Sequence, residues 1–349
     1  MPNTINLYET TTMLEAIKLV KEPSSFIRDT FFPNFKPFPT EKVLVDIVKG
    51  GEKMAPFVAP RINGTIDERQ GYSTNELTTP RIAPKRILTG EDLAKRQPGD
   101  NIYTIKSPEQ IAAQILMQDL IDLDKQIVRS EEWFSAKVML GEGFDIDLVD
   151  EKGTKAGTFN VNYGFSNNIS LLTAKKWSTV TNKPIEDIEA WIEEKIMPKS
   201  NATPNVVIMD PNAAKAFMAT DEVKATISLR AQAGYRQEPA YKGKGVTFIG
   251  VFTKFNLEFY AYSCLIKTGE TTSVQLLPSG TVIVAETGQG TMAYGAVTQK
   301  EKGTWMKYME KRVPKYVVSD ETETDTLKLT SRPLPYQRDV DSYVVATVL

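Results

Sequence analysis

The sequence of 349 residues contains no histidine. Histidine is the commonest general base near neutral pH and the commonest metal ligand in proteins. Its absence excludes catalysis by a Ser-His-Asp triad or by a Cys-His pair. No pair of other ionisable groups has a spacing to which the roles of general acid and general base can be assigned. The sequence therefore disfavours an enzyme, and only an active site built on lysine or carboxylate groups stays open as an alternative.

Cysteine is nearly as scarce, with Cys264 as the single example. One cysteine cannot form a disulfide within the chain, which fits synthesis in a reducing cytoplasm. Cys264 lies in the apolar, strand-like run 259–266. Free cysteines in such runs are usually buried and unreactive, so we expect an inert thiol and no nucleophile.

Long apolar runs are missing as well. No stretch approaches the roughly 20 apolar residues that a membrane-spanning helix needs, and the first ten residues lack the basic and apolar parts of a signal peptide. The charges nearly balance, with 42 Lys and Arg against 44 Asp and Glu. This balance creates no strong basic field for nucleic acid. We expect a protein without a membrane partner.

No motif for a phosphate group or a metal ion is present. Gly243-Lys244-Gly245 lacks the spacing of a phosphate-binding loop and precedes a strand-like run, so it predicts a tight turn. The acidic groups within 145–150 and 320–325 lack the spacing of a calcium loop. We interpret the first as a solvated strand face and the second as an exposed loop. No cofactor and no metal site are predicted.

What is present begins with a helix and a proline-rich arm. A capping-box spacing at Thr12 predicts a helix that ends before Pro23. Prolines within 33–39 force extended backbone, and we expect no helix core in the segment 26–33. The arm carries Phe31, Phe32, Phe35 and Phe38. These rings either fold back onto the chain's own core or dock on a neighbouring subunit. In the second case, replacing the first two by alanine would harm assembly more than folding.

The next region predicts strands and then a long irregular segment. Residues 42–48 and 54–59 read as two strands joined by a turn at Gly50-Gly51. Residues 61–106 show no sustained hydrophobic period. A segment of this length without a core pattern is usually functional or disordered. One interpretation is a β-hairpin flap that becomes ordered only against another chain.

A long helix follows. Ser107 is a suitable N-cap, Pro108 suits the first helical position, and Gln110 completes a capping box. The apolar period then continues to about Leu140, where glycines end it. At 1.5 Å per residue such a helix spans about 50 Å. It is either the core helix of a large domain or a beam across which a wide sheet lies.

The remaining two hundred or so residues predict a mixed α/β region followed by strands. Apolar alternation, caps and turn residues indicate strands at 144–149, 158–163, 206–209, within 246–266, and at 282–285, 305–308, 316–318, 327–330 and 343–349, and helices at 185–197 and 212–218. No internal repeat is present. A compact body with long appendages suggests a protein of assemblies.

Four short elements stand in a fixed order between residues 31 and 86. They are Phe31-Phe32-Pro33 through Pro37-Phe38-Pro39-Thr40-Glu41-Lys42-Val43, Met54-Ala55-Pro56-Phe57-Val58-Ala59-Pro60, Arg69-Gln70-Gly71-Tyr72-Ser73-Thr74-Asn75-Glu76-Leu77, and Pro80 through Pro84-Lys85. As an ordered set they resemble the phage lambda-type major head protein family. The segments 184–190, 210–211 and 331–335 also fit that family, so the resemblance covers nearly the whole chain.

The resemblance implies an α+β fold of the Hong Kong 97 capsid type. Its parts would be an N-terminal arm (1–40), an extended β-hairpin loop (41–106), a peripheral domain (107–179) with a spine helix (107–140), an axial α/β domain (180–300) and strands returning to the peripheral domain (301–349). In this fold the extended loop reaches over a neighbouring subunit.

The implied function is that of the major capsid protein of a tailed bacteriophage. Such a chain assembles with itself into hexamers and pentamers of an icosahedral shell around double-stranded DNA, and it is located in the virion. The implied partners are a scaffolding protein, a portal, a decoration protein and, through non-specific contacts, the packaged DNA. Another virion structural protein, such as a tail-tube or decoration component, is the alternative. The expected inter-subunit contacts come from Phe31, Phe32, Phe35, Phe38, Glu41, Lys42, Arg61, Arg69, Glu76, Arg81, Lys85 and Arg86.

Overall fold

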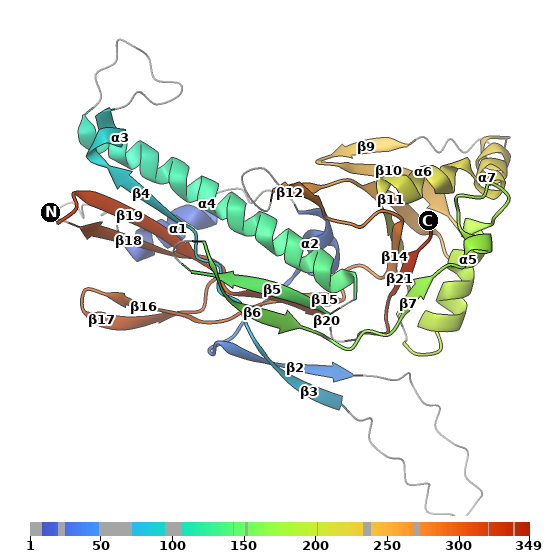
Figure 1. Ribbon diagram of the computed structural model, residues 1–349, viewed down its shortest axis with the longest axis horizontal. Coiled ribbons are helices and arrows are strands. Elements are labelled where there is room, and N and C mark those ends of the chain that lie inside the picture. Colours follow the sequence, from blue (N-terminus) through green and yellow to red (C-terminus); the bar gives the residue numbers. More distant parts are fainter. Residues whose placement is uncertain are drawn as a thin grey trace, which may run out of the picture.

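A computed structural model gives the architecture of most of the chain. It describes residues 9–19, 25–48, 72–94, 107–141, 143–150, 153–200, 202–232, 239–267, 273–319, 321–337 and 339–349. Figure 1 shows an elongated molecule in which one long helix crosses one half and a twisted sheet with several helices forms the other.

The long helix is α4, Pro108–Met139, with 32 residues. Its predicted start is confirmed: the Ser107 hydroxyl accepts a hydrogen bond from the Gln110 backbone N–H at 3.3 Å, and the Gln110 side chain accepts one from the Ser107 N–H at 3.2 Å. The helix buries an apolar stripe that includes Leu120, Ile127 and Phe134. Because sheets pack along this stripe, the helix is a beam inside the fold.

The N-terminal segment packs along α4. The predicted first helix is α1, Thr10–Leu19. The expectation that 26–33 contains no helix was wrong, because Phe26–Phe31 forms the short helix α2. The prolines begin only at Pro33, after this helix has ended, so they do not interrupt it. They do hold the next residues extended, as strand β1, Asn34–Pro37.

Two three-stranded sheets lie against α4. The first has the order β18–β19–β4, formed by Val313–Ser319, Thr324–Thr330 and Lys85–Thr89, and all its pairs are antiparallel. The second has the order β1–β15–β20, which adds Gly290–Tyr294 and Pro333–Gln337. Leu327 and Leu329 of β19 pack with Leu120 and Leu123 of α4. We call this part, residues 25–41, 79–94, 107–150 and 290–337, the helix region.

Three two-stranded hairpins extend from the helix region (Figure 1). They are β2–β3 (Lys42–Val48 with Tyr72–Thr78), β5–β6 (Phe144–Val149 with Lys155–Val161) and β16–β17 (Val297–Glu301 with Thr304–Tyr308). The predicted strand 54–59 lies outside the described residues, and the partner of β2 is β3, which the sequence did not predict. The short helix α3, Gly90–Ala94, follows β4.

The other half of the molecule is built on a seven-stranded sheet of the order β7–β21–β14–β8–β11–β10–β9. The strands are Asn168–Ser170, Val344–Thr347, Thr281–Ala285, Val206–Met209, Leu257–Tyr262, Val246–Phe252 and Ala240–Gly243. Helices α5 (Pro184–Trp191, continued by a π-helical turn, Ile192–Ile196), α6 (Pro211–Ala219) and α7 (Asp221–Gln232) accompany it. The small pair β12–β13 (Leu265–Lys267 with Ser273–Gln275) and the 3-10 turn Thr173–Lys175 complete this half.

Strand β8 shows why the sheet is stable at its centre. Its four residues are all buried. Val206 and Ile208 face the core shared with α4, while Val207 and Met209 face the cluster formed with α5 and α6. A strand covered on both faces reads as an unbroken apolar run, as this one does. Asp210 then caps α6 by accepting from the Asn212 N–H at 3.0 Å.

Strand pairing groups the elements into sheets, while the expected domain boundaries stay predictions. The C-terminal strand β21 pairs within the seven-stranded sheet, where Val344 and Ala346 are buried with α5 and α6, and Val345 faces the core shared with α4. Conversely, β15 and β16, expected in the axial domain, pair with β20 and β17 on the α4 side. Strand β4 belongs to the sheet on α4 and not to the extended loop. We call residues 168–285 and 344–348 the sheet region.

Candidate assembly surfaces

A buried ionic cluster joins distant segments to the long helix. Glu131 of α4 is 0% exposed. Its carboxylate pairs with Arg312 at 2.7 Å and with Arg28 at 2.9 Å, and it accepts a hydrogen bond from the Tyr294 hydroxyl at 2.9 Å. Arg312 also contacts Asp124, which lies about two turns before Glu131 on α4, at 2.7 Å. Burial alone would raise the pKa of Glu131, but the guanidinium groups of Arg312 and Arg28 hold it below its ordinary value.

The next residue, Glu132, connects the two halves of the molecule. Its two carboxylate oxygens accept from the backbone N–H groups of Ile27 and Arg28, each at 2.9 Å, at the start of α2. The hydroxyl of Tyr262, on β11 of the sheet region, donates to the same carboxylate at 2.7 Å. Burial raises the pKa of Glu132, although these three donors oppose the shift. One side chain therefore fixes α2, α4 and β11 to each other.

The cluster was missed in the sequence, although its spacing contained a clue. Glu131 lies four residues after Ile127 and three before Phe134, so it falls on the apolar stripe of the helix. A carboxylate at such a position must be paired when it is buried. Its partners, Arg28 and Arg312, are 103 and 181 residues away along the chain, and no local pattern connects them.

The hairpin β2–β3 is anchored at its base and then leaves the body (Figure 1). Val43 at its start is 0% exposed and belongs to the main core. The backbone N–H and the hydroxyl of Thr79 both donate to the Glu41 carbonyl, at 2.9 and 2.8 Å. Arg332 forms an ion pair with the Glu41 carboxylate at 2.9 Å. The base is thus rigid, while the hairpin beyond it lies apart from the sheets.

The four phenylalanines of the arm differ in burial. Phe31 is 0% and Phe32 is 3% exposed, in the core of this chain. Their expected role as inter-subunit contacts is therefore corrected: α2 turns these rings inward against α4, so the alternative of packing at home is the one realised. Phe35 is 43% exposed, with its ring 5.3 Å from that of Tyr294. Phe38 is half-buried beside the main core.

The charged candidates are also distributed over several places. Arg86 reaches α4, where it pairs with Asp119 and, at 3.4 Å, with Asp122, while its side chain stays 37% exposed. Glu41 is at the hairpin base, as described, and Lys42 beside it is exposed. Arg81 and Lys85 are exposed, Glu76 lies on β3 opposite Leu44, and Arg61 and Arg69 lie outside the described residues. Their contacts with other subunits stay predictions.

The hairpin β16–β17 is an exposed surface that the sequence did not indicate. Trp305 is 69% and Met306 is 45% exposed, and Met309 just after the hairpin is 51% exposed. Both faces of β17 are open to solvent. Large apolar side chains grouped in this way mark an interaction site more often than a free surface.

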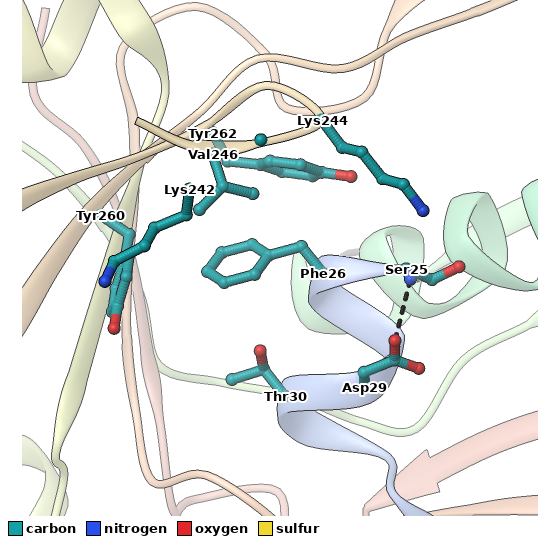
Figure 2. A pocket seen from close by; sticks show the side chains of 10 residues that line it. Ser25, Phe26, Asp29, Thr30, Lys242, Lys244, Val246, Tyr260 and Tyr262 are labelled. Carbon is teal, nitrogen blue, oxygen red and sulfur yellow. Dashed lines mark hydrogen bonds between the residues drawn. The ribbon is translucent and has the colours of Figure 1, made fainter. Parts of the chain in front are cut away.

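A groove runs between α2 and the β9–β10–β11 edge of the sheet region (Figure 2). Its volume is about 630 Å³, and a neighbouring hollow of about 410 Å³ shares Phe26, Asp29, Thr30 and Tyr260 with it. Figure 2 shows the Phe26 ring at the centre, with Lys242 and Lys244 along one side. Burial and the nearby Glu258 raise the pKa of Tyr260 to about 12. The lining offers aromatic surface and two lysines.

The weaker sequence motifs have ordinary structural roles. Gly243-Lys244-Gly245 forms the predicted tight turn between β9 and β10, with positive φ at all three residues. Asp145 and Asp147 lie on the exposed side of β5, as predicted. Burial raises the pKa of the half-buried Cys264 thiol, which makes it a weaker nucleophile.

Within the described ranges, no group of three or more His, Cys, Asp or Glu side chains is arranged to hold a metal ion. No helix among those residues is long and apolar enough to cross a membrane.

Comparison with known proteins gives a consistent result. The family model described as phage major capsid protein E matches residues 9–348. The major capsid protein of Escherichia phage lambda is 24% identical, over 97% of this chain and 98% of that protein. The major capsid protein of Escherichia phage N15 is 26% identical, over 96% and 97%.

Solved structures agree. A prophage capsid protein of Escherichia coli CFT073 superposes with a TM-score of 0.71 at 17% identity, covering 97% of this chain and 99% of that one. The capsid of Ralstonia phage GP4 gives a TM-score of 0.52 at 13% identity, covering 100% and 96%. The expected α+β fold of the Hong Kong 97 capsid type is therefore confirmed.

Proposed function

We propose that this chain, which belongs to the phage major capsid protein E family and is a capsid subunit of a tailed phage, assembles into hexamers and pentamers of an icosahedral shell around double-stranded DNA. The observation that carries the finer part of this proposal is the hairpin β2–β3. It is fixed at its base by Glu41 and Arg332, yet it projects from the body (Figure 1). A two-stranded hairpin alone is at best marginally stable in water, so a neighbouring subunit is the natural support.

The subunit consists of a rigid body, which keeps its shape, and of projections, which contact other subunits. Glu131 and Glu132 fix α2, α4 and strands from both halves, which keeps the body in one shape during assembly. The projecting hairpin β2–β3 and the exposed hairpin β16–β17 then supply contacts to other copies. Many moderate interfaces of this kind let subunits associate reversibly before the shell closes. Of the predicted contact residues, Phe35, Lys42, Glu76, Arg81 and Lys85 fit this role.

Further partners follow from the same proposal. A shell of defined size needs a scaffolding protein and a portal, and a decoration protein on the finished lattice would cover exposed hairpins. Contacts with the packaged DNA would be non-specific, because the chain carries a net charge of only −2. We propose that the chain has no catalytic role, is made in the host cytoplasm and is located in the virion.

The test is electron microscopy of the chain expressed alone and together with a scaffolding protein of the same phage. We expect closed shells whose surface shows six-fold and five-fold clusters. Rings or tubes without closure would favour a tail component. Monomers that persist at all protein and salt concentrations, with and without the scaffold, would contradict the proposal.

A further inference from the structure

Three lysines stand side by side on the outer face of the sheet β18–β19–β4. Lys315 of β18 is directly opposite Lys328 of β19, and Lys328 is directly opposite Lys85 of β4. The neighbouring register position holds Tyr316, Leu327 and Arg86, which face α4. Because successive residues of a strand point to opposite faces, the lysines point away from the body. We call Lys85, Lys315 and Lys328 the basic row.

The basic row is unfavourable for the isolated subunit. Like charges directly opposite each other on neighbouring strands are about 5 Å apart at Cβ and destabilise a sheet. Within the described ranges, no side chain forms an ion pair with Lys315 or Lys328. Partial burial lowers the pKa of Lys328, and the positive charges of Arg81, Lys315 and Lys85 lower it further. A surface that repels itself in this way is ready to accept an anionic group.

The same face of the sheet changes character along its strands. Beside the basic row lies a second row across the strands, Ile87, Thr326 and Val317, of which Ile87 is 55% and Val317 is 44% exposed. Beyond it, the turn that joins β18 to β19 presents the exposed carboxylates Glu321 and Glu323. We call residues 321–323 the acidic turn. From Lys315 to the end of β18 the sheet extends about 13 Å, at roughly 3.3 Å per residue.

We propose that the acidic turn of a second copy of this chain docks on the basic row, with the apolar row between them forming the centre of the contact. This rests on the proposed self-assembly. Charge complementarity identifies the occupant: one sheet carries Lys315 and Lys328, which have no ion pair within the described residues, at one end and exposed carboxylates at the other. An apolar centre with charged edges is the usual make-up of a protein interface. Because each copy carries the basic row and the acidic turn on either side of the same apolar row, the contact is reciprocal and joins two copies about a two-fold axis.

The test exchanges the charges of the two surfaces. K315E/K328E and E321K/E323K are each expected to reduce the yield of shells about tenfold or more at low salt, because each creates like-charge contacts between copies. The quadruple variant that carries all four changes restores opposite charges and should recover most of the yield. An equimolar mixture of the two double variants should also assemble better than either alone. K215E, on the exposed side of α6, is the matched control and should assemble normally.

Folding and other ligands are separated by two further measurements. Thermal unfolding of the unassembled subunit should be unchanged or improved in K315Q/K328Q, because repulsion is removed, while its shell yield still falls. The contact is overturned if both charge-reversed doubles form shells like the parent, or if the quadruple variant stays as impaired as K315E/K328E. If the quadruple variant stays impaired, and if it and K315E/K328E both lose binding to duplex DNA, the basic row binds nucleic acid and not a second copy. A parent chain that never forms shells would instead contradict the proposed function.

Discussion

The buried ion pairs around Glu131, which we call the junction, and the hairpin β2–β3 differ in whether their interactions are complete within one chain. At the junction a carboxylate with 0% exposure is matched by two guanidinium groups and a tyrosine hydroxyl, all from this chain. Within the described residues, strands β2 and β3 pair only with each other. Interactions that are complete within one chain determine how the subunit folds. Surfaces left incomplete determine what it does with other copies, so the two regions should respond differently to mutation.

The largest effect on the subunit is expected at the junction. E131Q keeps the shape of the side chain but removes the buried charge that Arg28 and Arg312 share, which leaves them only Asp29 and Asp124 as counter-charges. Breaking a buried ion pair from one side costs about 3–5 kcal/mol. Urea denaturation of the unassembled subunit should show this loss, while E194Q, on the exposed side of the turn after α5, should change little. Equal stability of E131Q and E194Q would contradict a stabilising role for the buried ion pairs of Glu131.

A loss of similar or slightly smaller size is expected from the arm. F31A removes a ring with 0% exposure from the main core and should cost about 3–5 kcal/mol. F35A removes a ring that is 43% exposed and should cost less than about 1 kcal/mol. Comparing the two variants by denaturation separates the buried and exposed parts of one arm. If F31A folds normally and only its assembly suffers, then that ring contacts a neighbour after all.

The third effect depends on pH. The pKa of Glu131 is lower in the folded chain than its ordinary value of 4.5, so its stabilising contribution is complete above that value and is lost as the pH falls through the folded pKa. The stability difference between the parent and E131Q should therefore shrink below about pH 4.5. Glu132 shifts the other way, so E132Q should not show this convergence. A difference that stays constant from pH 7 to pH 3 would contradict the paired state of Glu131.

The smallest effect on the subunit is expected at the outer hairpins. W305A changes a side chain that is 69% exposed and should alter the free energy of unfolding by less than about 0.5 kcal/mol. Replacing residues 49–71 by a two-residue Asn-Gly turn between β2 and β3 should likewise leave the body folded. Both variants should nevertheless give fewer or weaker shells in electron microscopy. Normal shells from both would mean that these hairpins are not assembly contacts.

The parts of the fold that were predicted are those with local causes. The start of α4 follows from Ser107, Pro108 and Gln110, which act within one turn. Strand β8 follows from four consecutive apolar residues. By contrast, β15 and β20 are defined by pairing with each other across more than forty residues, and neither has a distinctive pattern. The short helix α2 was missed because it depends on Glu132, which caps it from far along the chain.

The site was predicted less well, for a related reason. The ordered elements from Phe31 to Arg86 identified the family, but they did not distinguish residues that hold the subunit together from residues that face outward. Phe31 proved to be buried, and Arg86 pairs with α4 although its side chain is 37% exposed. Lys85 was among the predicted contacts, but Trp305, Lys315 and Lys328 were not foreseen, because exposure and cross-strand neighbours exist only once strands are paired. An assembly surface is also completed by another copy, whose position no single chain specifies.

Hydrogen exchange measured on unassembled subunits and on assembled shells tests the division between a complete interior and incomplete hairpins most directly. The account predicts that residues 131–139 of α4 are strongly protected in both states. Residues 72–78 of β3 and 304–308 of β17 should exchange quickly in the subunit and become protected in the shell. Hairpins that are already as protected as α4 in the subunit, or that gain no protection in the shell, would contradict the account.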